Sequence, residues 1–395
     1  MNNLIKRTWA EISLDNIEHN YKIIREKTDK NAMLCCVIKA DGYGHGAVQI
    51  ARLYEKLGAD WFCVSNIEEA LELRQNGLTL PILILGYTPA SCAKILAENN
   101  ISQACYCLDY AKSLSENAVL QNVTVKIHLK LDTGMSRIGL MCQQFERDDS
   151  SIDTAETICR LPNIYPQGVF THFAVSDESI DGKDFTLHQF DCFMHTVNEL
   201  ESRGIKFDIR HCANSGAIID YPQTHLDMVR AGIILYGLAP SQKLKGKLDL
   251  HPAMELKSVI SQVKQIEAGT TVSYGRTFTA QKNTKVATVP IGYADGFIRQ
   301  IAEKGYININ GQKAKILGRI CMDQIIVDAE NCGDIKIGNT VTLFGCENNN
   351  TPTADDIADW TDTINYEVVC LVSKRVARVY IQNGKEIETV DHILG

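Results

Sequence analysis

Hydrophobic and polar positions follow two different rhythms along the chain. In its first half, short apolar runs alternate with segments in which apolar residues recur at helical spacing. The apolar runs lie at residues 33–38, 61–65, 82–85, 104–107, 125–131, 168–171, 207–212 and 226–229. Counted from Met33, they form a series of eight strands, each followed by a helix or a helical turn. Such a series is typical of an α/β protein built as a (β/α)8 TIM barrel.

The rhythm changes after residue 256. Short β-branched runs, separated by glycine and asparagine turns, lie at residues 259–266, 286–291, 313–317, 324–328, 340–344 and 375–381. They predict a small, mainly β C-terminal domain. We therefore expect a barrel domain over residues 1–242 and a β-rich domain over residues 243–395, with residues 243–249 as the linker. At the start of the chain, residues 7–14 alternate like a strand, and Asp15 is expected to cap the helix that follows.

Composition narrows the class of protein. The 395 residues carry a net charge of −8, and no basic stripe offers neutralisation of phosphates, so we expect no nucleic acid partner. The polar start lacks a signal-peptide pattern, and no run approaches the ~18 apolar residues of a membrane span. The 14 cysteines include no CxxC pair, so we expect no metal site and interpret them as reduced thiols of a cytoplasmic protein.

A lysine ends the first apolar strand. Lys39 follows the run 33–38 and precedes three glycines within seven residues, which indicates a tight loop at the carboxyl end of the strand. Barrels of this class carry their chemistry at that end. A partly desolvated lysine amine loses its proton more easily than a free one, as a Schiff-base lysine requires. On the strand pattern alone, an ordinary lysine that extends to water is the favoured interpretation of the position.

Further polar residues follow the later strands. Arg137, His172, the pair Asn214-Ser215, and Arg230 each stand at the end of a different predicted strand. Each one alone could be a structural hydrogen-bonding group, and Asn-Ser before a helix is also a common cap. Because the carboxyl ends of barrel strands converge, their joint occurrence with Lys39 indicates one site.

The motifs that carry these residues resemble those of alanine racemases, and the resemblance extends over nearly the whole chain. Ile38-Lys39-Ala40-Asp41-Gly42-Tyr43-Gly44-His45-Gly46 looks like the attachment motif for pyridoxal 5'-phosphate in that family. Further matches, in order, lie at residues 132–139, 171–174, 214–215, 227–237, 272–275, 291–296, 318–323 and 366–367. Small departures occur at Ser136 and Ala231, where glycine or asparagine and proline are expected, and neither side chain touches a reacting atom.

The resemblance implies a division of roles between the two domains. Lys39, in the barrel, would hold pyridoxal phosphate as an imine and act as the base on one face of the substrate Cα. Tyr274, in the C-terminal domain, would be the base on the other face, supported by His172 and Arg230. Arg230 would lie at the pyridine nitrogen, where a permanent positive charge disfavours protonation and therefore transamination.

The remaining site residues are also carried over from the family. The resemblance assigns cofactor binding to Tyr43, His172, Asn214, Ser215, Arg230, the amides of Gly232 and Ile233, and Tyr366. The substrate carboxylate would be held by Arg137 and the amide of Met322. Lys130 matches a position that can carry a carbamate. The entrance of the site would be formed by Asp177, Tyr293, Arg299 and Arg319.

These roles imply an alanine racemase that interconverts L-alanine and D-alanine and supplies D-alanine for peptidoglycan, working as a homodimer with shared active sites. A serine or broad-spectrum amino-acid racemase is an alternative within the family. A non-catalytic pyridoxal phosphate carrier is an alternative of a different class, disfavoured because such carriers have a single domain. A decarboxylase of similar architecture is disfavoured because that branch places an acidic residue where Arg230 stands.

Overall fold

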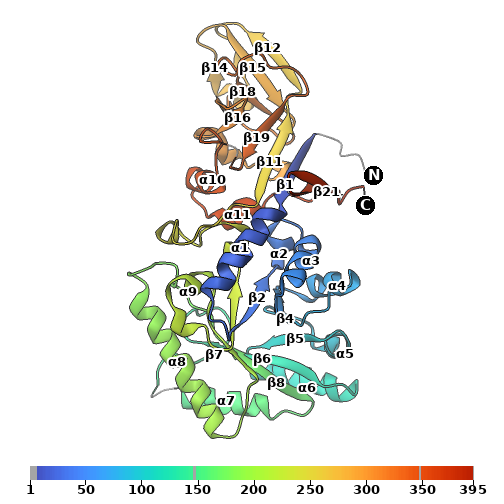
Figure 1. Ribbon diagram of the computed structural model, residues 1–395, viewed down its shortest axis with the longest axis vertical. Coiled ribbons are helices and arrows are strands. Elements are labelled where there is room, and N and C mark those ends of the chain that lie inside the picture. Colours follow the sequence, from blue (N-terminus) through green and yellow to red (C-terminus); the bar gives the residue numbers. More distant parts are fainter. Residues whose placement is uncertain (1–6, 146–147, 347, 395) are drawn as a thin grey trace. The chain divides into compact units, whose positions relative to one another are not determined.

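The computed structural model describes residues 7–145, 148–346 and 348–394 (Figure 1). The chain divides into two compact units. The barrel unit comprises residues 18–42 and 47–251, and the C-terminal unit comprises residues 7–17, 43–46 and those from 252 onward. No helix among the described residues is long and apolar enough to cross a membrane.

Eight parallel strands form the barrel unit, and the predicted TIM barrel is confirmed. They are β2 (Met33–Val37), β3 (Trp61–Val64), β4 (Ile82–Ile84), β5 (Ile101–Cys105), β6 (Val125–Asp132), β8 (Ile164–Phe170), β9 (Ile209–His211) and β10 (Met228–Ala231). They pair in the order β10-β2-β3-β4-β5-β6-β8-β9, and the short β7 (Leu140–Met141) pairs with β6. Between β9 and β10, the Asp227 N–H donates to the Arg210 carbonyl at 3.2 Å and the Arg230 N–H donates to the Ala213 carbonyl at 3.0 Å.

Helices lie around the outside of these strands, as Figure 1 shows for α3 to α8. The α-helices are α1 (Leu14–Lys27), α2 (Lys39–Tyr43), α3 (Ala47–Leu57), α4 (Ile67–Gln75), α5 (Ala93–Glu98), α6 (Leu108–Leu120), α7 (Asp149–Cys159), α8 (Lys183–Ser202) and α9 (Ser215–Asp220). Short 3-10 helices are η1 (Ala90–Cys92), η2 (Pro222–Thr224), η3 (Ile233–Tyr236) and η4 (Gln242–Leu244). Helix α3 illustrates the packing, because its buried side chains recur at spacings of three and four, from Ala47 and Val48 to Ala51 and Tyr54.

The C-terminal unit is built on a seven-stranded sheet in the order β17-β16-β19-β11-β1-β20-β21. Its strands are β1 (Thr8–Ser13), β11 (Met254–Val259), β16 (Tyr306–Ile309), β17 (Gln312–Lys315), β19 (Thr340–Phe344), β20 (Ala377–Gln382) and β21 (Lys385–Val390). Strand β1 is antiparallel to β11 and parallel to β20, so the first described strand of the chain lies inside this sheet.

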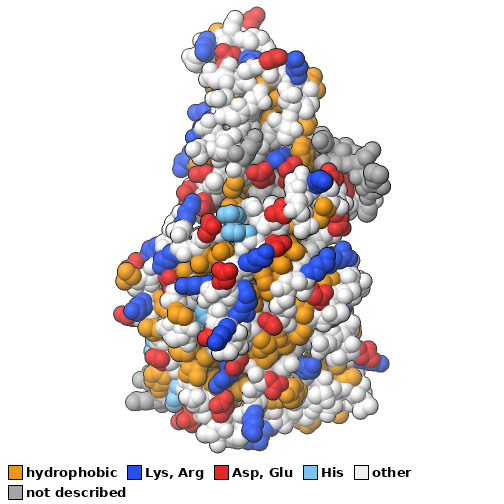
Figure 2. Space-filling model, viewed as in Figure 1, with side chains coloured by type: hydrophobic (Ala, Val, Ile, Leu, Met, Phe, Trp, Pro, Cys, Tyr) orange, Lys and Arg blue, Asp and Glu red, His pale blue; other side chains and the backbone are white. Residues whose placement is uncertain are grey.

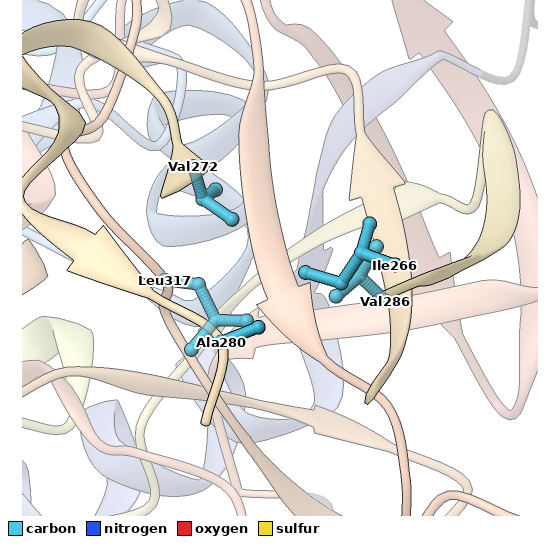
Figure 3. Close-up of a cluster of buried hydrophobic side chains, with 5 residues drawn as sticks. All are labelled: Ile266, Val272, Ala280, Val286 and Leu317. Carbon is cyan, nitrogen blue, oxygen red and sulfur yellow. The ribbon is translucent and has the colours of Figure 1, made fainter. Parts of the chain in front are cut away.

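A smaller β subregion completes the C-terminal unit. It comprises the strands β12 (Gln262–Ile266), β13 (Thr271–Val272), β14 (Phe278–Thr279), β15 (Thr284–Val289) and β18 (Ile325–Asp328). The helices of the whole C-terminal unit are η5 (Tyr274–Arg276), η6 (Tyr293–Asp295), η7 (Arg299–Glu303), α10 (Ala354–Thr361) and α11 (Asn365–Cys370). Figure 3 shows its apolar cluster, in which Ile266 and Val286 lie side by side and Leu317 lies against Ala280. Burial of such side chains is worth about 1.5–3 kcal/mol each.

The observed units differ from the predicted boundary between residues 242 and 243. Residues 7–17 belong to the C-terminal unit because β1 pairs there, and the barrel unit continues to His251. The predicted linker is held against the barrel by ion pairs. The Lys243 ammonium lies 2.6 Å from Asp181, and the Lys247 ammonium lies 2.6 Å from Asp220.

Two local expectations were also wrong. The run 259–266, expected to be one strand, is divided between β11 and β12, because the Ile260 and Ser261 amides donate instead to the Asn339 and Thr288 carbonyls. The first helix begins at Leu14, one residue before the expected cap. There the Ser13 hydroxyl accepts from the Asn16 N–H at 3.2 Å, and Asp15 accepts from the Asn383 N–H instead.

The four residues 43–46 belong to the C-terminal unit and are fastened there through their backbone. The buried Arg378 guanidinium donates to the Gly44 carbonyl at 3.0 Å, and the Tyr380 hydroxyl donates to the His45 carbonyl at 3.0 Å. Gly44 has φ +79°, and a Cβ at this position would lie 2.3 Å from the Val369 carbonyl oxygen. Only glycine fits so close to another backbone.

On the face shown in Figure 2, acidic and basic side chains are interspersed. No extended basic stripe crosses the described residues of that face. This face therefore offers no positively charged band of the kind that binds nucleic acid, in keeping with the net charge of −8.

Candidate active site

Lys39 lies at the end of the first barrel strand, as the sequence predicted. The turn that carries it is left-handed at Ala40, Asp41 and Gly42, with φ values of 53°, 53° and 60°. Two carboxylates hold this backbone. Glu69 accepts from the Ala40 N–H at 2.7 Å, and Asp41 accepts from the Ala47 N–H at 2.9 Å. Left-handed conformations at non-glycine residues cost free energy and concentrate at functional sites.

Arg230 is the central charged group of the barrel interior. It is 4% exposed, and its guanidinium donates to His211 Nδ1 at 2.8 Å and to the Thr171 carbonyl at 2.9 Å. Longer contacts of 3.3 Å and 3.2 Å reach His172 Nδ1 and the Cys212 carbonyl. Among the described residues it has no carboxylate partner, so neutral acceptors alone surround a permanent positive charge.

These contacts fix the protonation of two buried histidines. Since an arginine only donates, His211 Nδ1 must be an acceptor and the proton of this ring lies on Nε2. His211 Nε2 then donates to His128 Nδ1 at 2.8 Å. The result is a chain of hydrogen bonds in which the Arg230 guanidinium donates to the neutral His211 ring and His211 donates to the neutral His128 ring.

Burial and positive neighbours keep the histidines neutral. Burial, with Arg230 as the first of several cations, holds the pKa of His172 and of His211 well below the ordinary range. Burial also lowers the pKa of His128 to about 3. Sequence reasoning missed His128 and His211. Their only sequence signal is a histidine inside an apolar run, a pattern more often structural than catalytic.

Two more cations contribute to this region. Lys130 on β6 is 3% exposed, and its ammonium donates to the Leu131 carbonyl at 2.5 Å. Burial is the main cause that lowers the pKa of Lys130 to about 7, against the opposing charge of Asp132. Arg137 is exposed on the loop after β6, where Asp132 accepts from the Gly134 and Ser136 amides at 3.1 and 2.9 Å.

Asn214, Ser215, Gly232 and Ile233 line the ends of the last two barrel strands. Asn214 caps α9 by accepting from the Ala217 N–H at 3.1 Å, so the structural reading of this residue is also correct. The Ser215 hydroxyl accepts from the Gly232 N–H at 2.9 Å and ties the two strand ends together. Asp177, the expected entrance residue of the barrel, is half-buried, and burial raises the pKa of its carboxyl.

The arrangement in the barrel unit suits an anionic ligand. Lys39, Lys130, Arg137 and Arg230 all act electrostatically on His172, and each lowers its pKa. Arg230 lacks an acidic partner among the described residues, and a buried cation of this kind is costly unless another group compensates it. The anionic groups of a ligand would therefore be favoured among these cations.

The C-terminal unit brings a second group of expected residues together. Tyr274 is 68% exposed and Met322 is 52% exposed. Their loops are joined by the residues beside them, because the Ser273 hydroxyl donates to the Arg319 carbonyl at 2.5 Å and lies 3.5 Å from the Cys321 sulfur.

Two other expected residues of this unit, Tyr293 and Tyr366, lie near these loops and near Tyr43, respectively. The Tyr293 N–H donates to the Cys321 carbonyl at 3.1 Å, and Arg299, at the start of η7, is exposed. The rings of Tyr43 and Tyr366 lie with their centres 6.1 Å apart. Each unit thus gathers its own share of the expected site.

We predict that the three neutral histidines His128, His172 and His211 make the protein sensitive to acid. Their folded-state pKa values lie below the ~6.5 of an unfolded histidine, so the unfolded chain binds more protons as the pH falls below that value. The free energy of unfolding should therefore decrease as the pH falls below about 6.5, by about 1.4 kcal/mol per pH unit for each histidine.

Urea unfolding at a series of pH values below about 6.5 would measure the slope of the free energy of unfolding against pH. This slope reports how many protons the chain takes up on unfolding. In His128→Gln that number should decrease by about one, whatever the change in the free energy of unfolding itself. The matched control is His188→Gln, which replaces an exposed histidine outside the group of His128, His172 and His211. Equal slopes in wild type and His128→Gln would contradict this reading of the histidine chain.

Comparison with known proteins agrees with this geometry. A family model described as "Alanine racemase, N-terminal domain" matches residues 12–240, and "Alanine racemase, C-terminal domain" matches residues 253–380. An alanine racemase of Clostridium tetani is 46% identical over 382 residues, which cover 96% of this chain and 97% of that protein.

Solved structures give the same result over the full length. The alanine racemase of Clostridium difficile 630 superposes with a TM-score of 0.93 at 43% identity, covering 99% of this chain and 100% of that one. Its complex with cycloserine has a TM-score of 0.90 at 42% identity, covering 98% and 99%. The chain therefore belongs to the alanine racemase family of pyridoxal-phosphate-dependent isomerases.

Proposed function

We propose that this protein interconverts L-alanine and D-alanine, with Lys39 holding pyridoxal 5'-phosphate. The observation that carries the proposal is the buried Arg230, held only by neutral partners near the strand ends where Lys39, Ser215 and Gly232 lie. When bound, the cofactor supplies an electron-withdrawing ring that makes the Cα proton of an amino acid acidic. Its phosphate would bind the hydroxyls of Tyr43, Ser215 and Tyr366 and the amides of Gly232 and Ile233, with Asn214 ordering the adjacent turn.

Arg230 favours racemisation over transamination. Its guanidinium stays protonated, and its neutral partners offer no carboxylate that would place a proton on a neighbouring nitrogen. Arg230 would therefore disfavour protonation of a pyridine nitrogen held beside it, and this favours racemisation over transamination. His172, kept neutral by burial and by Arg230, remains able to accept a hydrogen bond.

Two bases on opposite faces would exchange the proton. We assign them as Lys39 and Tyr274, because inversion at Cα needs removal on one side and delivery on the other. Arg137 and the amide of Met322 would hold the substrate carboxylate. Asp177, Tyr293, Arg299 and Arg319 would form an entrance that favours a side chain as small as methyl.

We further propose that the D-alanine serves peptidoglycan synthesis in the cytoplasm.

Incubating the holoenzyme with L-alanine in D₂O tests the reaction. We expect D-alanine and α-deuterium to appear together. Tyr274→Phe removes the second base and should reduce racemisation by roughly 10²-fold or more. The control Tyr306→Phe, which alters a tyrosine packed on Trp360 in the same unit, should retain the wild-type rate. A fully active Tyr274→Phe variant would refute the assignment, and cofactor binding without either product would refute the reaction.

We propose that Lys130 carries a carbamate. Its neutral amine would attack CO₂, forming an N–C bond and releasing one proton, and the resulting anion would compensate Arg137 instead of repelling it. The lowered pKa, about 7, makes the neutral amine abundant near neutral pH. Mass spectrometry under gentle conditions in bicarbonate should show one added CO₂, absent from Lys130→Ala and present in the control Lys126→Ala. An intact mass that lacks this addition would rule the carbamate out.

We also propose a homodimer in which Tyr274 and Met322 complete the partner's site. Both residues are more than half exposed although the Tyr274 side chain and the Met322 amide are assigned to the substrate, and exposed apolar groups of this kind mark interaction surfaces. Activity per chain should fall on dilution as sedimentation velocity shows dissociation. Undiminished activity where only monomer sediments would exclude shared sites.

A further inference from the structure

Two histidines and an aspartate meet on the surface of the barrel unit, away from the residues assigned to catalysis. His19 lies on α1, and Asp249 and His251 lie in the segment after η4. The two imidazole rings are stacked, with centres 3.9 Å apart and planes 9° from parallel. One ligand atom from each of the three residues lies within 4.8 Å of the other two.

The Asp249 carboxylate faces both rings. One oxygen lies 3.5 Å from His19 Nε2 and the other lies 3.4 Å from His251 Nε2. These separations are too long for charge-assisted hydrogen bonds, which are about 2.7–2.9 Å. Each is close to the edge of a tetrahedron around zinc, which is roughly 3.3–3.4 Å when the bonds are about 2.0–2.1 Å. The two contacts use different oxygens of Asp249, so a turn of this side chain would bring one oxygen to a position shared by both imidazoles.

A buried amide holds the two halves of this cluster in place. Asn20, next to His19, has no exposed surface, and its side chain bonds both backbone groups of His251. Its amide donates to the His251 carbonyl at 2.8 Å, and its carbonyl accepts from the His251 N–H at 2.8 Å. The relative placement of α1 and the segment 249–251 is therefore fixed before any ion binds.

We propose that His19, Asp249 and His251 form a binding site for a divalent transition metal ion of the zinc type. Two imidazole nitrogens and one carboxylate oxygen suit zinc, whereas calcium and magnesium prefer oxygen ligands alone. Three protein ligands leave the fourth tetrahedral position to water. The spacing of cysteines in the sequence gives no indication of this site, because no cysteine takes part in it.

Metal binding requires a small rearrangement that the surface permits. His19 Nε2 contacts the Asp249 carbonyl at 2.8 Å. In the metal-bound form this contact is replaced, and the ring proton moves to Nδ1. The parallel rings must splay so that both lone pairs point at one ion. The His251 and Asp249 side chains are 47% and 75% exposed, which leaves them free to turn.

The ion would act as a clamp between α1 and the segment 249–251. Because it binds the folded barrel in preference to the unfolded chain, it would raise the unfolding temperature further as the free metal concentration rises above the Kd. The site is independent of the proposed racemase activity.

Titration of the metal-free holoenzyme with Co²⁺, and then with Zn²⁺, tests the site. We expect one saturable Co²⁺ per chain with the visible bands of a tetrahedral complex and without the ultraviolet charge-transfer band of a thiolate ligand. Zn²⁺ should displace Co²⁺ and raise the unfolding temperature. Binding should weaken roughly tenfold or more in His251→Ala and be lost in the double variant His19→Ala, His251→Ala.

Two controls keep the test decisive. His188→Ala removes an exposed histidine elsewhere in the barrel unit and should bind Co²⁺ like wild type. The far-ultraviolet circular dichroism spectrum of the double variant and a cooperative urea transition verify that it is folded. The proposal is overturned if the folded double variant binds as tightly as wild type, if the Co²⁺ spectrum shows thiolate ligation, or if wild type fails to saturate.

Discussion

A positive charge buried without an acidic partner organises the interior of the barrel. A lone buried ion costs several kcal/mol unless hydrogen bonds or another charge compensate it. Around Arg230, that compensation comes from carbonyl oxygens and from two histidine nitrogens that can only accept. The acceptor role of His211 then determines its tautomer and, through it, the hydrogen bond to His128. Protonation states across the centre of the barrel thus follow from one guanidinium.

The parts of the fold that depend on local patterns were predictable from sequence. Buried parallel strands appear as continuous apolar runs, so each of the eight predicted runs overlaps a barrel strand, although β5 begins at Ile101 and β8 at Ile164, before the runs 104–107 and 168–171. The helix expected after the first of these strands is α3, in which buried side chains recur at spacings of three and four. In the barrel, Lys39, His172, Ser215 and Arg230 do lie at strand ends, because in this fold position along a strand determines which end of the barrel a residue occupies.

What could not be predicted depends on contacts between distant residues. Nothing in the alternation of residues 8–13 indicates that the partners are strands more than 240 residues away. His128 and His211 carry no local sign that Arg230 will join them. Helices α10 and α11 were missed because they are short and lie among runs rich in strand-forming residues. The left-handed turn after Lys39 depends on Glu69, which lies on α4.

The central place of β1 in its sheet has a consequence for how the protein can be divided. A fragment that begins at residue 243 would lack the strand between β11 and β20. The sheet would then split into a four-stranded and a two-stranded piece, each with an open edge on which other chains could pair. A separately produced C-terminal fragment is therefore a candidate for aggregation rather than a folded module. Joining residues 7–17 to it through a new linker would restore the missing strand.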